Sequence, residues 1–79
     1  MGTAEETKRI MYEARVGKDL CRRIIRSIEH DARQGCAVSF LELAMIDVEV
    51  QSHIVRWLMF EGYDVSGTPT TKIRVSWEA

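Results

Sequence analysis

Cysteine and proline are scarce in this sequence, and long hydrophobic runs are absent. The 79 residues include two cysteines and one proline. Two cysteines form at most one disulfide, and these two are too far apart to match the closely spaced pairs of a zinc site. No apolar stretch approaches the roughly 18 residues of a membrane-spanning helix, and the polar start, Met1–Ile10, lacks the apolar region of a signal peptide. We therefore expect a soluble cytoplasmic protein with reduced thiols.

The sequence also lacks the short motifs of several enzyme classes. It contains neither of the glycine patterns that bind phosphates and dinucleotides, and no Gly-x-Ser-x-Gly nucleophile motif. The two histidines, His30 and His53, have no carboxylate or cysteine three or four residues further along. We predict that His30 lies at the surface near a helix end and that His53 is partly buried with its hydrogen bonds satisfied. The sequence predicts a protein that is not an enzyme and that uses no metal or other cofactor.

Neither sign of charge dominates. The net charge of −1 argues against general nucleic-acid binding, because that affinity depends on many cationic contacts to phosphates. The length predicts one domain spanning residues 1–79, and the hydrophobic share of 46% is sufficient for a core. A domain this short buries about 60% of its unfolded surface, so a partner would add useful stability.

The longest regular pattern is helical and covers residues 4–34. Thr3 and Glu6 have the spacing of a capping box, no proline interrupts the segment, and Gly35 follows as a natural stop. One continuous helix would extend about 45 Å, beyond a domain whose radius of gyration is about 12 Å. The alternative is a break near Gly17 that gives two shorter helices, because glycine costs about 1 kcal/mol relative to alanine inside a helix.

The overhanging half of such a helix would leave its apolar seam uncovered, so we predict a homo-oligomer. Small residues on the seam, Ala14 and Gly17, would let a second helix approach closely. An alternative for Cys21 is a buried free thiol in the core of the chain itself. The residues predicted to form the oligomer interface are Ile10, Met11, Ala14, Gly17, Leu20, Cys21 and Ile24.

Residues 36–79 predict an α/β unit. Segment 36–46 fits either a short buried strand or a helical turn, and we favour the strand. Asp47 is the expected N-cap of a helix that ends at Gly62. Ser66–Thr70 is rich in turn residues, and the alternating pattern of Ile73–Trp77 is typical of a half-buried strand. The predicted class is α+β with the order α-β-α-β-β, and the alternative is two or three helices plus a β-hairpin.

Basic residues gather on the side of the N-terminal helical segment opposite the apolar seam. Residues 1–35 hold eight of the eleven lysines and arginines. The planar guanidinium group suits phosphate and carboxylate ligands, although a solvated face with local ion pairs is the simpler alternative. The residues that we assign to ligand or partner binding are Arg15, Arg22, Arg23, Arg26 and Arg33.

Several short motifs share one layout with a known type of protein. They are Ala32-Arg-Gln-Gly35, Val38, Leu58-Met-Phe-Glu-Gly-Tyr63, Val65 and Ile73-Arg-Val-Ser-Trp77. This layout resembles small, mostly uncharacterised accessory proteins of tailed phages and prophages. The segment between Gly35 and Gly62 is longer than in that type. The resemblance implies a phage origin and the order α-β-α-β-β, but no activity. We expect a protein of this kind in the host cytoplasm.

These features lead to one main functional hypothesis, an accessory protein that acts by binding as an oligomer. It would inhibit or sequester a host or defence protein, or a small anionic signalling nucleotide held by the arginines between subunits. One alternative is a minor structural or assembly protein of the virion. The other is nucleic-acid binding through the arginine-rich helix face.

Overall fold

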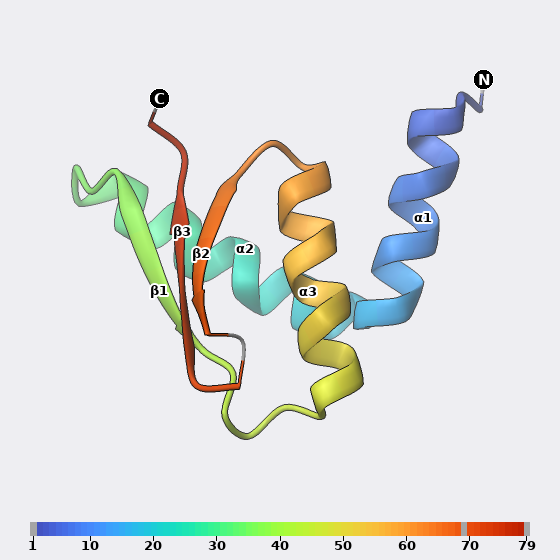
Figure 1. The fold of residues 1–79 in the computed structure, drawn as a ribbon. Coiled ribbons are helices and arrows are strands. Elements are labelled where there is room, and N and C mark those ends of the chain that lie inside the picture. Colours follow the sequence, from blue (N-terminus) through green and yellow to red (C-terminus); the bar gives the residue numbers. More distant parts are fainter. Residues whose placement is uncertain (1, 69, 79) are drawn as a thin grey trace.

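The computed structural model describes residues 2–68 and 70–78, which form three helices beside one antiparallel sheet (Figure 1). Helices α1 (Ala4–Val16) and α2 (Lys18–Arg33) come first. They are followed by β1 (Val38–Glu42), α3 (Val48–Phe60), β2 (Asp64–Thr68) and β3 (Lys72–Ser76). The α+β class is confirmed, as are the favoured strand within 36–46, the helix after it and the closing hairpin.

The continuous helix predicted over residues 4–34 is wrong, and the alternative break at Gly17 is confirmed. Gly17 has a φ of 103°, a conformation that residues with a Cβ rarely adopt. Its amide donates to the carbonyl of Glu13 and closes α1, and α2 begins at the next residue. The molecule is 35 Å long, shorter than the roughly 45 Å of one continuous helix.

After this break, α1 lies beside α3 (Figure 1). The rings of Tyr12 and Phe60 pack with their centroids 5.2 Å apart. The guanidinium of Arg9 lies 5.6 Å from the centre of the Phe60 ring, and its Nε donates to Oε1 of Glu61 over 2.7 Å. At the other end of α1, the hydroxyl oxygen of Thr3 accepts from the amide of Glu6, as the capping-box spacing predicts. Helix α1 is thus packed against the C-terminal end of α3 within the same chain.

The strand order is β1-β3-β2, so the last strand of the chain lies in the middle of the sheet. Leu41 of β1 lies opposite Ile73 of β3, and Val65 of β2 lies opposite Val75. Ile73 and Val75 are buried beneath the helices, whereas Phe40 and its neighbours in β3 and β2, on the other face, are exposed. The helices therefore cover one face of the sheet.

The connection between β2 and β3 starts later than the sequence pattern predicts. Ser66, Gly67 and Thr68 belong to β2, and the turn residues that the structure describes are Thr70 and Thr71. The remaining residue of the predicted turn, Pro69, lies outside the described residues. The predicted end of α3 is confirmed, because Gly62 follows it with a φ of 99°.

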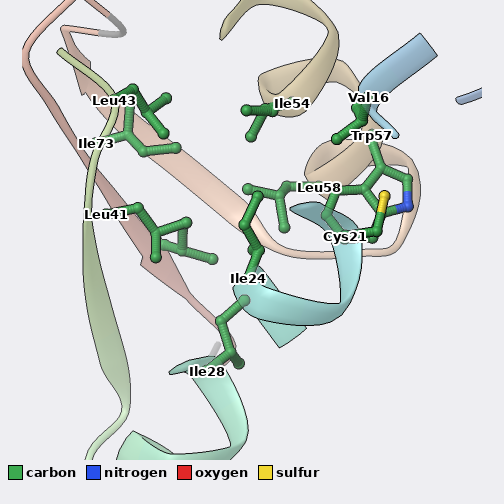
Figure 2. Close-up of a cluster of buried hydrophobic side chains, with 11 residues drawn as sticks. Val16, Cys21, Ile24, Ile28, Leu41, Leu43, Ile54, Trp57, Leu58 and Ile73 are labelled. Atoms are coloured by element: carbon green, nitrogen blue, oxygen red, sulfur yellow. The ribbon is translucent and has the colours of Figure 1, made fainter. Parts of the chain in front are cut away.

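The core lies between the helices and the covered face of the sheet (Figure 2). Its buried side chains come from every helix and from β1, β3 and the residue after β1: Val16, Cys21, Ile24, Ile28, Leu41, Leu43, Ile54, Trp57, Leu58, Ile73 and Val75. The seam predicted for one long helix is therefore divided. Its second half enters this core, whereas Ile10 and Ala14 remain exposed on α1.

One buried polar residue, Gln51, connects α3 to the loop after β1. Its Nε2 donates to the carbonyl oxygens of Leu43 and Ile46, over 2.6 and 2.9 Å. The predicted N-cap, Asp47, holds that position, but its side chain makes no capping hydrogen bond. The hydrogen bonds of Gln51, a residue in the first turn of α3, therefore hold the start of this helix against the preceding loop.

Candidate binding site

A hollow of about 500 Å³ opens where the three helices meet. α2 contributes residues spaced three and four apart, which therefore lie on one face of the helix. α1 contributes a residue of its last turn, and α3 contributes an aromatic ring. The residues lining the hollow are Glu13, Lys18, Cys21, Arg22, Ile25, Arg26 and Trp57. The break at Gly17 creates this site, because it brings α1 against α3 beside the first two turns of α2.

Positive charge outweighs negative charge around the hollow. Lys18, Arg22 and Arg26 share it with one carboxylate, that of Glu13. Nη1 of Arg22 lies 3.6 Å from Oδ1 of Asp19, but both side chains are largely exposed, and such pairs contribute at most about 1 kcal/mol. Within residues 2–68 and 70–78, neither Lys18 nor Arg26 has a carboxylate oxygen within 4 Å. These cations are available to an anion.

The start of α2 adds to this positive potential. Its N-cap, Gly17, has no side chain that could accept a hydrogen bond from the first amides of the helix. Unpaired amides at a helix start carry partial positive charge. Because Lys18 and Cys21 belong to this first turn, an anion in the hollow would also experience the favourable end of the helix dipole.

The rest of the lining is neutral. Ile25 is half-buried, and Cys21 and Trp57 belong to the core. Burial raises the pKa of the Cys21 thiol to about 11, and the carboxylates of Glu13 and Glu61 act in the same direction. At neutral pH Cys21 is therefore an uncharged thiol that contributes apolar surface, not the thiolate that nucleophilic chemistry requires. The hollow thus combines a cationic side with an uncharged side.

The structure brings together two of the five arginines that the sequence singles out. Arg22 and Arg26 line the hollow. Arg15 and Arg33 are exposed in the last turns of α1 and α2, and Arg23 is exposed beside Arg22 but does not line the hollow. Arg15 lies before the break at Gly17. On α2, Arg23 follows Arg22 by one residue and so lies on a different side of the helix, and Arg33 lies about two turns beyond Arg26.

Sequence reasoning did not assign five residues of the hollow to a binding site: Glu13, Lys18, Cys21, Ile25 and Trp57. A single continuous helix has no junction with a second helix, so it gives no reason to group Glu13 with Lys18. The available signal was the glycine at position 17, followed by residues at 18, 22 and 25 with helical spacing. Trp57 was predicted on the apolar side of its helix, which is confirmed by its burial.

The residues predicted to form an oligomer interface also divide into two groups. On α1, Ile10 is 69% exposed, Ala14 is exposed and Met11 is half-buried. Cys21 and Ile24 are buried in the core of the chain, so their assignment to an oligomer interface is wrong. The alternative for Cys21, a buried free thiol, is confirmed. Gly17 and Leu20 are half-buried at the junction of the helices. Because α1 packs against α3, the chain itself buries part of the α1 surface that a second copy was expected to bury.

The two histidines lie where the sequence predicts. His30 is exposed in the last turn of α2, and His53 is half-buried on α3. The prediction that the hydrogen bonds of His53 are satisfied is wrong, because its Nδ1 is buried without a partner among the described residues. In the part of the chain that the structure describes, no three histidine, cysteine, aspartate or glutamate side chains gather in a way that could hold a metal ion. In the same part, none of the helices has the length and apolar character needed to cross a membrane.

Comparison with protein-family models, curated proteins and solved structures finds no match to this chain. The features of the molecule that bear on function are therefore the hollow and the exposed surfaces of the helices.

Proposed function

We propose that the protein is a non-enzymatic binding protein that holds a small anionic ligand in the hollow between α1, α2 and α3. The imbalance of charge carries this proposal, because three cations share the hollow with one carboxylate. Guanidinium and ammonium groups form strong, charge-assisted hydrogen bonds with phosphate and carboxylate oxygens. The volume of about 500 Å³ also falls within the roughly 300–1,000 Å³ of small-molecule sites.

The resemblance to tailed-phage accessory proteins supports a role for such binding. A phage protein in the host cytoplasm can act by withdrawing a signalling nucleotide or another small anion of the host from solution. Sequestration needs affinity and a sufficient amount of protein, but no turnover. The neutral thiol at Cys21 and the cationic residues beside it are consistent with this role.

The proposal predicts that Arg22 and Arg26 contribute to ligand binding and that Arg23 does not. Isothermal titration calorimetry with pyrophosphate, ribose 5-phosphate and AMP would measure this. We expect Arg22→Gln and Arg26→Gln each to weaken binding about tenfold, because a charge-assisted hydrogen bond contributes about 1.5 kcal/mol or more. The matched control is Arg23→Gln, which removes the same charge from the same helix outside the hollow and should change affinity less than twofold.

Two outcomes of this titration would contradict the proposal. One is that none of the three anions binds with a dissociation constant below about 1 mM, the weak end of the affinity scale. The other is an equal loss in all three variants, which would indicate diffuse attraction to the basic side of α2. Tighter, steeply salt-dependent binding of a single-stranded oligonucleotide would instead favour the nucleic-acid alternative.

The exposed side of α1 supports a second candidate function, association with another copy or with a host protein. Ile10 is 69% exposed, and Ala14, one helical turn further on, is exposed beside it. We expect light scattering to detect a dimer whose mass falls to that of the monomer in Ile10→Lys. The control is Met59→Lys, which changes an exposed apolar residue of α3 and should leave the mass unchanged. A monomer at every accessible concentration would exclude self-association.

A further inference from the structure

The hollow is elongated along α2, and a cationic residue lies at each of its ends. Its lining on this helix runs from Lys18 to Arg26, and eight residues of helix extend about 12 Å. Lys18, Arg22 and Arg26 are four residues apart, so each lies about 6 Å along the helix axis from the next. The positive charge therefore forms a row along the hollow.

One phosphate group can use only part of this row. A phosphate monoester carries a charge of about −1.5 to −2 and three acceptor oxygens, which can bridge Arg22 and Arg26, neighbours one helical turn apart. Lys18 lies about 12 Å from Arg26 along the axis. To reach the same phosphate, both long side chains would have to bend toward each other and lose rotamer freedom. Lys18 is therefore left for a second anionic group.

The start of α2 favours a second anion beside Lys18. The amides of the first turn have no side-chain cap, because the N-cap is Gly17, and they carry partial positive charge. The acidic residue of this turn, Asp19, does not line the hollow. Its side chain is 92% exposed and lies 3.6 Å from Nη1 of Arg22, so solvent and this pairing weaken its repulsion of an anion.

The surface of α2 between the two cationic places is uncharged. Cys21 is a neutral thiol at neutral pH, and Ile25 is half-buried one turn further on. Across the hollow, α1 contributes the carboxylate of Glu13, which repels a further anionic group and accepts hydrogen bonds from hydroxyl groups. The middle of a ligand that lies along the hollow is therefore uncharged, and hydroxyl groups suit it.

We infer that the hollow takes a molecule with a phosphate group at each end and an uncharged, hydroxyl-bearing middle, such as a sugar bisphosphate. One phosphate binds between Arg22 and Arg26, and the other binds at Lys18 and the start of α2. This assignment rests on the proposed function, because it specifies the ligand of the same site. It goes further in one respect, since the number of phosphates and the separation between them determine the affinity.

The test compares ligands that differ in the number and spacing of their phosphates. Fructose 1,6-bisphosphate carries two at opposite ends of the sugar, fructose 6-phosphate lacks one of them, and pyrophosphate joins two through a shared oxygen. Isothermal titration calorimetry measures their affinities for the unaltered protein, for Lys18→Gln and for Lys8→Gln. Lys8 provides the matched control, because it is an exposed lysine of α1 outside the hollow. Lys18 is exposed as well, and melting temperature establishes that each variant folds.

We expect fructose 1,6-bisphosphate to bind about tenfold more tightly than fructose 6-phosphate or pyrophosphate, because its second phosphate gains a charge-assisted hydrogen bond. Lys18→Gln should remove this advantage and change the affinity for fructose 6-phosphate less than twofold. Lys8→Gln should leave the affinities for all three ligands unchanged.

Equal affinity for the three ligands, or an advantage of the bisphosphate that survives Lys18→Gln, would overturn the inference. In either case, binding of fructose 6-phosphate that depends on Arg22 and Arg26 leaves the proposed anion site intact. Absence of binding by all three ligands would overturn both.

Discussion

Gly67 lies where the pairing of β2 with β3 leaves no room for a side chain. Its φ is 102°, and a Cβ at this position would lie 2.7 Å from the carbonyl oxygen of Lys72. The neighbouring obstacle is backbone, which cannot move aside without disturbing the ladder. Gly62 has a similar φ of 99°, but a Cβ there would have no heavy atom within 4 Å. A side chain at Gly62 would therefore meet only backbone strain, whereas one at Gly67 would meet both backbone strain and steric overlap.

We predict that Gly67→Ala destabilises the protein by about 3 kcal/mol, because strain and overlap act together. Gly62→Ala is the matched control and should cost about 1 kcal/mol, the price of a left-handed backbone for a residue with a Cβ. Urea denaturation of both variants measures the difference. If both variants lost the same free energy of unfolding, the overlap of a Cβ at position 67 with the Lys72 carbonyl would contribute nothing, which would contradict the prediction.

The sequence places individual buried residues better than it identifies the residues of the site. Alternation and helical spacing correctly assign Ile54, Trp57 and Val75 to the core. The same patterns contain no information on whether a buried polar atom has a partner. The Trp57 N–H has no partner among the described residues, and Glu13 lines the same hollow as the cations of α2. Both features depend on how three helices meet, which local spacing does not determine.

At the level of the elements, Gln51 joins the loop after β1 to α3. Both carbonyl oxygens that it satisfies belong to this loop, which connects the sheet to the helix layer. The side chain is 3% exposed, so water cannot readily replace it. The amide thus stabilises the position of the whole helix as well as its own turn.

We predict that Gln51→Met lowers the free energy of unfolding by about 2 kcal/mol. Methionine fills a similar volume but donates no hydrogen bond, so the carbonyl groups of Leu43 and Ile46 lose their partner. The exposed neighbouring residue provides the control, since Ser52→Ala should change stability by less than about 0.5 kcal/mol. Chemical denaturation measures both variants, and a neutral Gln51→Met would exclude the proposed role of these hydrogen bonds.

The elements themselves were largely predictable, and the error over the N-terminal helix has a clear physical cause. The strand within 36–46, the helix ending at Gly62 and the hairpin each follow from periodicity and from turn residues. The helix over 4–34 was predicted as continuous because a single glycine costs only about 1 kcal/mol. Packing of Tyr12 and Arg9 against Phe60 favours the broken form, and these contacts join residues too distant in sequence for local patterns to detect.

For the whole molecule, this break has two consequences. It lays α1 against α3, and it assembles the hollow from three helices. A continuous helix would instead have carried Tyr12 away from Phe60 and left α1 without the cover of α3. The class of the fold therefore followed from the sequence, whereas the shape of the molecule and the site depended on a contact between the first helix and the third.

The strand order β1-β3-β2 also determines when the chain can fold during its synthesis. β1 and β2 do not pair with each other, and both take their partner from the strand made last. The ribosome adds about 5–20 residues each second. During synthesis β1 therefore has no strand to pair with until β3 has been translated. We expect a nascent chain that stops before Lys72 to expose its apolar strands to chaperones, and the binding hollow to form only after β3 has emerged.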